Sequence, residues 1–288
     1  MDDAAGPRDK REPVRRRRDS VDFFIAGATD AGKKRKENQD NFFVEQFASE
    51  RGNVAFAVLC DGMGGLNHGE VASQFIASAF FRWTQEILLH WTEENWDDQD
   101  IRRQWTAIIE EQNERIRAYG KEREETLGST ATVLLLTEKR YYVLNVGDSR
   151  AYEMSDTVRQ LTLDHTVLAD ELRRGNLTVE QARDYPLSHV LTKCVGVTPR
   201  VVPDFFFGEP KADAVYLLCS DGFRNRISEE EMYAALMPQG EQVVSWLKEA
   251  NERLIRLNMQ RGETDNISVV AIYTRCTSER EDRSNGIL

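Results

Sequence analysis

The chain has 288 residues, 40% of them hydrophobic, and carries a formal net charge of −11. This length suits one large domain or two small ones, and this hydrophobic content excludes disorder throughout the chain. Because the charge is strongly negative, we expect no nucleic-acid partner. No run approaches the length of about 18 apolar residues that a spanning helix needs, so we expect a cytoplasmic protein without a membrane span.

Both ends of the chain are charged and lack apolar periodicity. Residues 1–20 include the run Arg15 to Arg18 and predict a basic, flexible tail. The alternative is a docking segment for an acidic partner or a membrane surface. Residues 277–288 predict a frayed C-terminal tail, which places the folded domain at residues 21–276.

Short apolar runs separated by turns predict strands early in the chain, at residues 23–27, 41–47 and 54–59. Their short connections favour antiparallel pairing. Apolar side chains at helical spacing then predict helices at residues 70–91 and 100–123. Further strands are expected at residues 130–136, 140–146 and 151–154.

The second half begins with a polar, helix-prone stretch at residues 163–190, in which Thr178 and Gln181 predict a helix start. The elements predicted after it are strands at 201–207 and 215–219, a helix opened by Ser228 with Glu231, a helix at 241–259 and a strand at 267–273. Strands in hairpins and helices in two blocks predict an α+β fold, a four-layer α/β/β/α sandwich of two antiparallel sheets flanked by helices.

The four cysteines show no CxxC spacing; they are Cys60, Cys194, Cys219 and Cys276. We expect reduced thiols rather than a disulfide or a soft-metal site. A cysteine nucleophile is not expected either.

Four short acidic segments each adjoin a strand-like apolar run. They are Cys60-Asp61-Gly62, Gly147-Asp148-Ser149, Ser220-Asp221-Gly222 and Thr264-Asp265-Asn266. Any one of these acids, taken alone, is more often a turn residue that caps its own backbone. Carboxylates on tight turns at strand ends can converge, however, and like charges a few Å apart repel strongly in a site of low dielectric. The four segments together predict a site for a divalent cation.

The loop before the first acidic segment offers groups of a second kind. Arg35 presents a planar fork of donors that suits a phosphate, and Asp40 could hold water on a metal. A basic surface loop taken alone usually stays solvated, so a functional role for this loop must be supported by the rest of the sequence.

Six ordered segments resemble those of the metal-dependent Ser/Thr protein phosphatases of the PP2C type, the PPM family, in its bacterial branch. They are Asp40-Asn41, Asp61-Gly62-Met63-Gly64-Gly65, Gly147-Asp148-Ser149-Arg150, Asp164-His165, Ser220-Asp221-Gly222 and Asp265-Asn266. The resemblance runs from about residue 23 to residue 273, and residues 163–190 are similar to the family's flap. It implies hydrolysis of phosphoserine and phosphothreonine in proteins by direct attack of a metal-bridged water. The implied partners are phosphorylated substrates of a Ser/Thr kinase, and the chain is expected to be a monomer.

The resemblance also implies which residues bind metal. It places two ions, Mn²⁺ or Mg²⁺, on Asp61 as the bridging ligand and on the carbonyl oxygen of Gly62, while Asp221 and Asp265 complete one of them. Asp40 would steady waters on the metal. All of these ligands are oxygens, which suit Mn²⁺ and Mg²⁺ better than Zn²⁺ or Cu²⁺.

Three further positions take roles from the resemblance. Arg35 would grip the substrate phosphate, and Asp148 with Asp221 matches a third, weaker metal position whose occupancy stays open. Met63 stands where animal relatives have a histidine thought to protonate the leaving alcohol, so that proton would come from metal-bound water or, as a weaker alternative, from His68. For His165 we expect a structural hydrogen bond.

Two alternatives to a general phosphatase stay open. The chain could be a catalytically silent PP2C-like module that senses a partner, although no metal carboxylate is missing. It could also be an enzyme dedicated to one kinase or one regulator.

Overall fold

The computed structural model describes residues 20–49, 52–64, 68–90, 97–183 and 185–277. Its strands are β1 (Ser20–Asp30), β2 (Asp40–Ser49), β3 (Gly52–Gly64), β4 (Leu127–Ser129), β5 (Ala131–Thr137), β6 (Tyr141–Val146), β7 (Arg150–Met154), β8 (Val158–Gln160), β9 (Asp204–Gly208), β10 (Ala214–Cys219) and β11 (Ile267–Thr277). Its helices are α1 (Gly69–Glu86), the 3₁₀ turn η1 (Leu88–His90), α2 (Asp98–Arg123), α3 (Val167–Arg173), α4 (Val179–Ala182), α5 (Asp221–Arg224), α6 (Glu229–Leu236) and α7 (Val243–Gln260). The predictions for residues 1–19, Gly65, Trp91 and residues 278–288 lie outside the described residues.

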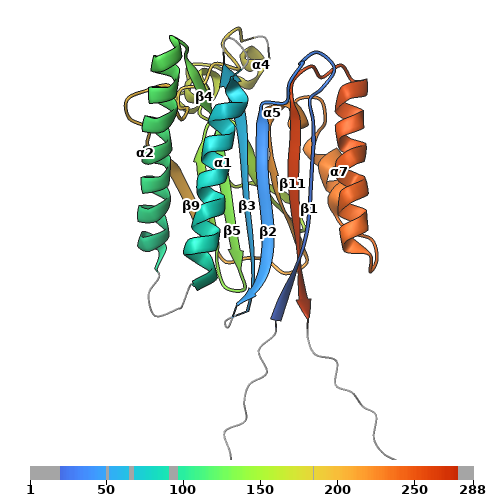
Figure 1. Ribbon diagram of the computed structural model, residues 1–288. Coiled ribbons are helices and arrows are strands. Elements are labelled where there is room, and N and C mark those ends of the chain that lie inside the picture. The colour runs from blue at the N-terminus through green and yellow to red at the C-terminus, as the bar shows by residue number, and fades with distance from the viewer. Residues whose placement is uncertain (1–19, 50–51, 65–67, 91–96, 184, 278–288) are drawn as a thin grey trace, which may run out of the picture.

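Two antiparallel sheets lie face to face, and helices cover the outer face of each (Figure 1). One sheet has the strand order β2-β3-β5-β6-β9, with β4 paired to β3, and the other has the order β1-β11-β10-β7-β8. Helices α1 and α2 lie outside the first sheet, and α7 lies outside the second (Figure 1). The predicted four-layer α+β sandwich is confirmed.

The alternation of β3 shows why its sequence suits a buried central strand. Its even-numbered residues from Val54 to Cys60 pack under α1 and α2, whereas Ala55, Ala57 and Leu59 pack between the two sheets. Successive side chains of a strand point to opposite faces, so a strand that is covered on both faces reads as a continuous apolar run. Outside this sheet, Trp105 packs edge-on against Phe56 and fills the layer beneath the helices.

Several elements differ from their predictions at one end. The first helix ends at Glu86 rather than at residue 91, because η1 follows and turns Leu88 into the core with 1% exposure. Strand β9 begins at Asp204 rather than at residue 201, directly after Pro203, which has no N–H to donate to a ladder. The short elements β4, β8 and α5 were not predicted. No helix among the described residues is both long enough and apolar enough to cross a membrane.

Candidate functional site

A cavity of about 580 Å³ opens where ends of strands from both sheets meet. It is lined by Arg35, Gln39, Asp61, Gly62, Met63, Gly64, Thr130, Asp148, His189, Leu191, Asp221, Asn225, Arg226, Glu263, Thr264 and Asp265. Every predicted site residue except Asp40 is among these, and Asp40 pairs with Asp61 in the register of β2 and β3. Residues that are more than 200 positions apart in the sequence therefore share one cavity.

Asp61 does not sit on a turn, as we predicted from its sequence, but inside β3. The strand continues to Gly64 because β4 extends the ladder alongside it. The Asp61 N–H donates to Oγ1 of Thr130 at 2.9 Å, and the Asp61 carbonyl accepts from the Thr130 N–H at 2.9 Å. Bonds on both sides of the residue fix the backbone that carries this carboxylate.

Gly62 lies at a close approach between β3 and the start of α1. A Cβ atom at this position would lie 2.2 Å from the carbonyl oxygen of Gly69, which is backbone and cannot easily move away. The Gly62 N–H donates to the carbonyl of Gln39 at 3.1 Å, which ties the strand to the loop before β2. The sequence therefore needs glycine here for packing, independently of any ligand role.

Asp40 and Asp61 form a pair of neighbouring carboxylates with little compensation. Asp40 as a whole residue is 6% exposed, and no well-formed hydrogen bond from the described residues reaches either of its carboxylate oxygens, although the hydroxyls of Ser220 and Ser268 lie nearby. Burial raises the pKa of Asp40 to about 7. Removal from water, followed by the charge of Asp40, holds the pKa of Asp61 well above its usual range. Bound cations would reverse both effects.

Asp148 lies in the turn between β6 of the first sheet and β7 of the second, and Asp221 follows β10 of the second sheet. Asp148 follows Gly147, whose φ of 106° is strained for other residues, and the Asp148 side chain is 9% exposed. Burial and the charge of Asp221 raise the pKa of Asp148 to about 7. Asp221 is the first residue of α5, where burial raises its pKa and the charge of Arg224 opposes that rise.

Arg35 and Asp265 face each other at the mouth of the cavity. The Nε and Nη2 atoms of Arg35 each donate to one carboxylate oxygen of Asp265 at 3.0 Å. The two side chains remain 53% and 38% exposed. In this arrangement the predicted phosphate-binding fork holds a predicted metal ligand instead.

The donor set fits hard divalent cations, although it is not closed into a metal cage. Among the described residues, no group of three or more His, Cys, Asp or Glu side chains is drawn close enough together to hold a metal ion. The Arg35 fork engages both carboxylate oxygens of Asp265, which is one of the predicted ligands. The unpartnered oxygens of buried Asp40 and the raised pKa values of Asp61 and Asp221 show negative charge that lacks a counter-ion, and oxygen-only donors suit Mn²⁺ or Mg²⁺.

The two histidines considered from the sequence have partners outside this chemistry. His165 accepts a hydrogen bond at Nδ1 from the Gly147 N–H at 3.0 Å, and its Nε2 bonds to Asp204 at 2.9 Å. His68 lies just before α1, and its Nδ1 pairs with Glu125 at 2.7 Å. The hydrogen bonds of His165 agree with the structural role that we expected for it, and His68 is engaged with Glu125.

Arg200 follows Cys194 at the Cys-x5-Arg spacing of cysteine-dependent phosphatases, a spacing contrary to our expectation that no cysteine nucleophile is present. Its thiol is 6% exposed, and burial raises its pKa to about 12. A thiol with such a pKa holds almost no thiolate at neutral pH, so Cys194 is no nucleophile. All four cysteines are free, as expected, but Cys276 is exposed rather than buried.

Two groups that the sequence did not reveal shape the site. Glu263 accepts from the backbone N–H groups of Thr264 and Asp265, at 2.7 and 3.0 Å, and so fixes the turn that presents Asp265. Arg224, one helical turn after Asp221, lies beside Asp148. Residues three positions apart on a helix are neighbours, so the spacing of Asp221 and Arg224 could have placed them together. That inference requires α5, which was not predicted.

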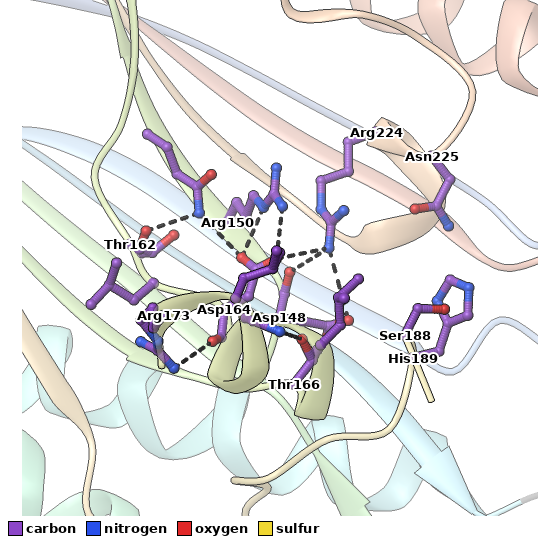
Figure 2. A pocket seen from close by; sticks show the side chains of 15 residues that line it. Asp148, Arg150, Thr162, Asp164, Thr166, Arg173, Ser188, His189, Arg224 and Asn225 are labelled. Atoms are coloured by element: carbon purple, nitrogen blue, oxygen red, sulfur yellow. Dashed lines mark hydrogen bonds and ion pairs between the residues drawn. The ribbon is translucent and has the colours of Figure 1, made fainter. Parts of the chain in front are cut away.

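A second cavity of about 500 Å³ adjoins the first and shares Asp148, His189 and Asn225 with it (Figure 2). It lies between the sheet and the segment around α3. Arg150 binds Asp164 there through two hydrogen bonds, at 2.8 and 2.7 Å. The flap-like segment at residues 163–190 thus forms one wall of a cavity next to the carboxylates.

Comparison with known proteins identifies similar chains. The family model described as protein phosphatase 2C matches residues 29–260. A serine/threonine phosphatase stp from Listeria welshimeri is 30% identical over 262 residues, which cover 89% of this chain and 98% of the relative.

Two solved structures are similar along most of the chain. The serine/threonine phosphatase Stp1 from Staphylococcus aureus superposes with a TM-score of 0.73 at 27% identity, covering 90% of this chain and 98% of that one. The catalytic domain of the serine/threonine phosphatase PstP, solved with 2 manganese ions, gives a TM-score of 0.69 at 28% identity and covers 89% of this chain and 100% of that domain.

Proposed function

Because this chain belongs to the protein phosphatase 2C family, we propose that it hydrolyses phosphoserine and phosphothreonine in proteins with the help of divalent cations. One observation supports this assignment above the others. Loops and strand ends from both sheets bring the guanidinium of Arg35 and the carboxylates of Asp61, Asp148, Asp221 and Asp265 to one open cavity.

The residues that we propose to hold the cations are Asp61, the Gly62 carbonyl, Asp221 and Asp265, with Asp40 beside them. When bound, a pair of Mn²⁺ or Mg²⁺ ions lowers the pKa of a coordinated water and makes it a nucleophile at neutral pH. The solved structure of PstP with 2 manganese ions supports Mn²⁺ as the ion to use in a first assay.

We assign Asp40 the role of orienting this water. Its two carboxylate oxygens accept no well-formed hydrogen bond from the described residues, although the hydroxyls of Ser220 and Ser268 lie nearby, so they retain lone pairs that can accept from water. Its pairing with Asp61 in the ladder of β2 and β3 fixes the direction from which it does so. A buried acceptor held on a strand loses little entropy when it binds the water.

Arg35 is the group that we propose to bind the phosphate. Its fork already holds a carboxylate in the bidentate geometry that also suits a phosphate. When Asp265 takes part in cation binding, the guanidinium becomes available to the substrate. Its exposure of 53% lets it turn toward a substrate at the mouth of the cavity.

The leaving alcohol must receive a proton, and the side chains nearest in sequence to Gly62 do not offer one. Met63 has no titratable proton, and His68 is engaged with Glu125. We therefore propose that water in the cavity supplies it. A kinase counterpart, a monomeric state and a cytoplasmic location remain predictions from the sequence.

A phosphopeptide assay tests the proposal. Wild-type protein should release phosphate from phosphoserine and phosphothreonine peptides with Mn²⁺ and stop when a chelator is added. Asp221→Asn should lose about a hundredfold or more in kcat/KM, since it removes a charged ligand. Asp213→Asn is the matched control, because Asp213 precedes β10 whereas Asp221 follows it, so the two acids lie at opposite ends of that strand. Asp213 pairs with Tyr273 at 3.0 Å, and its φ of 52° suits asparagine.

The outcomes separate the proposal from its alternative. Equal and chelator-insensitive rates for wild type and Asp221→Asn would refute the metal mechanism. Clear binding of phosphopeptide by the wild type without any turnover in Mn²⁺ or Mg²⁺ would instead support the catalytically silent module.

A further inference from the structure

Arg224 places a guanidinium beside Asp148 at the boundary of the two cavities (Figure 2). Its Nη2 donates to the backbone carbonyl of Asp148 at 3.1 Å and lies 3.8 Å from the Asp148 carboxylate. The same nitrogen lies 3.6 Å from the carboxylate of Asp164. The Arg224 side chain is only 15% exposed, so water screens these charges weakly.

The carboxylates around this arginine already have cations beside them. Asp164 is held by the fork of Arg150 at 2.8 and 2.7 Å, and Arg224 approaches both Asp164 and Asp148. Two arginines thus meet three carboxylates, Asp148, Asp164 and the neighbouring Asp221. A divalent ion on Asp148 would bring two further positive charges beside a guanidinium, and like charges at such distances repel.

The position of Arg224 is fixed by more than its charge. The hydrogen bond to the Asp148 carbonyl engages the same nitrogen that approaches the carboxylate, so the side chain cannot swing away without breaking that bond. Helix α5 sets the spacing, since Arg224 lies one turn after Asp221 on the same short helix. Arg224 is therefore oriented toward Asp148 by the same element that carries a proposed metal ligand.

From this geometry we propose that Arg224 is a built-in cation that takes the place of a third metal ion at Asp148. The chain then loads ions only on the side of Asp61, Asp221 and Asp265, and Asp148 serves as an anchor for Arg224. This inference rests on the proposed function, because it concerns which of the carboxylates hold cations. It assigns no cation to the third metal position, whose occupancy the sequence left open.

Counting bound Mn²⁺ tests this inference without measuring turnover. Free Mn²⁺ in solution gives an EPR signal that disappears on binding, so a titration gives ions per chain. Wild type should bind two ions, Arg224→Gln should bind one more, and Arg224→Gln with Asp148→Asn should return to two. Arg173→Gln is the matched control, because Arg173 lines the same cavity but its described bonds go to Asp170 and to the Asp164 carbonyl.

A second comparison holds even if Arg224→Gln does not fold. Asp148→Asn in the otherwise wild-type chain should leave the ion count unchanged, and Arg224→Lys should do the same because the charge remains. Three ions on the wild type, or the loss of one ion in Asp148→Asn, would overturn the inference while leaving the proposed phosphatase intact. An unchanged count in folded Arg224→Gln would also overturn it. A wild type that binds no Mn²⁺ would instead refute the proposed metal centre and, with it, this inference.

Discussion

Arg35 has two candidate partners, the carboxylate of Asp265 and the phosphate of the substrate, and enzyme kinetics can tell which of them it serves. It holds Asp265 at 3.0 Å through two bonds, whereas the proposed function needs it on the phosphate. We expect Arg35→Ala to raise KM for a phosphopeptide by about tenfold to a hundredfold, since hydrogen bonds to charged groups contribute about 1.5 to 3 kcal/mol. The affinity of the Arg35→Ala variant for Mn²⁺ should stay equal or increase, because the guanidinium no longer competes with Mn²⁺ for the carboxylate of Asp265.

Steady-state kinetics and a Mn²⁺ titration check both halves of this prediction. Lys33→Ala is the control, because Lys33 is an exposed cation in the same loop. An unchanged KM in Arg35→Ala, or a loss of Mn²⁺ affinity, would show that Arg35 does not bind the phosphate.

Asp40 is a residue whose charge should destabilise the metal-free fold. Both of its carboxylate oxygens are buried and lack a hydrogen bond from the described residues, and Asp61 lies opposite in the ladder. Asp40→Asn removes one of two neighbouring buried charges. We expect it to stabilise the metal-free protein by about 1 kcal/mol or more, a rise in Tm of about 2–4 °C per kcal/mol, and to weaken Mn²⁺ binding. A Tm of Asp40→Asn below that of the wild type, measured by calorimetry in chelator, would contradict this prediction.

At the scale of elements, the contact between α5 and β11 aligns two proposed ligands. A Cβ on Gly222 would lie 2.2 Å from the backbone carbonyl oxygen of Asn266. We expect Gly222→Ala to push α5 away from β11, which separates Asp221 from Asp265 and lowers both Tm and kcat. Overpacking of this kind costs about 1 to 3 kcal/mol. Thermal melting and the phosphopeptide assay check this prediction. If Gly222→Ala has the Tm and kcat of the wild type, the contact between α5 and β11 can adjust to the added methyl group without cost.

A second contact ties β9 to the segment after the flap. Asp204 bonds to Nζ of Lys193 at 2.6 Å and to His165 at 2.9 Å. Burial would raise the pKa of Asp204, but these two partners outweigh it and leave the pKa below its usual range. A carboxyl with a depressed folded pKa stabilises the fold above its unfolded pKa, and this contribution disappears as the pH falls through the folded value.

Asp204→Asn should therefore destabilise the protein by about 1 kcal/mol at pH 7 and by progressively less below about pH 4. Urea unfolding at several pH values measures the difference from wild type. Asp156→Asn, at an exposed position, is the control. A difference that is constant from pH 7 to pH 3 would mean that the charge of Asp204 is not responsible.

Two kinds of sequence signal predicted elements correctly: long apolar patterns and helix capping residues. The capping boxes at Thr178 and Ser228 identified the starts of α4 and α6, and both boxes are present in the structure. The short β4 was missed because its pairing with β3, not its own composition, defines it. That same pairing turned the predicted turn at Asp61 into a strand.

At the scale of the whole molecule, the architecture follows from burial. Strands covered on both faces, such as β3, can only lie between two layers, and the sequence contains enough amphipathic helix to supply the outer ones. The grouping of site residues at one cavity was also predictable, from the acidic segments beside strand ends and from the resemblance of the ordered segments to the phosphatase family. Contacts such as those of Arg224 with Asp148 and of Arg35 with Asp265 were not, because they depend on side-chain geometry after folding.

The most direct test of a metal-dependent phosphatase site in this cavity is anomalous diffraction from crystals grown with Mn²⁺. We predict two manganese peaks within bonding distance of Asp61, Asp221 and Asp265, with none on Asp148, and Arg35 turned away from Asp265. Crystals in saturating Mn²⁺ that show no peak in the cavity, with Arg35 still on Asp265, would contradict the proposed site.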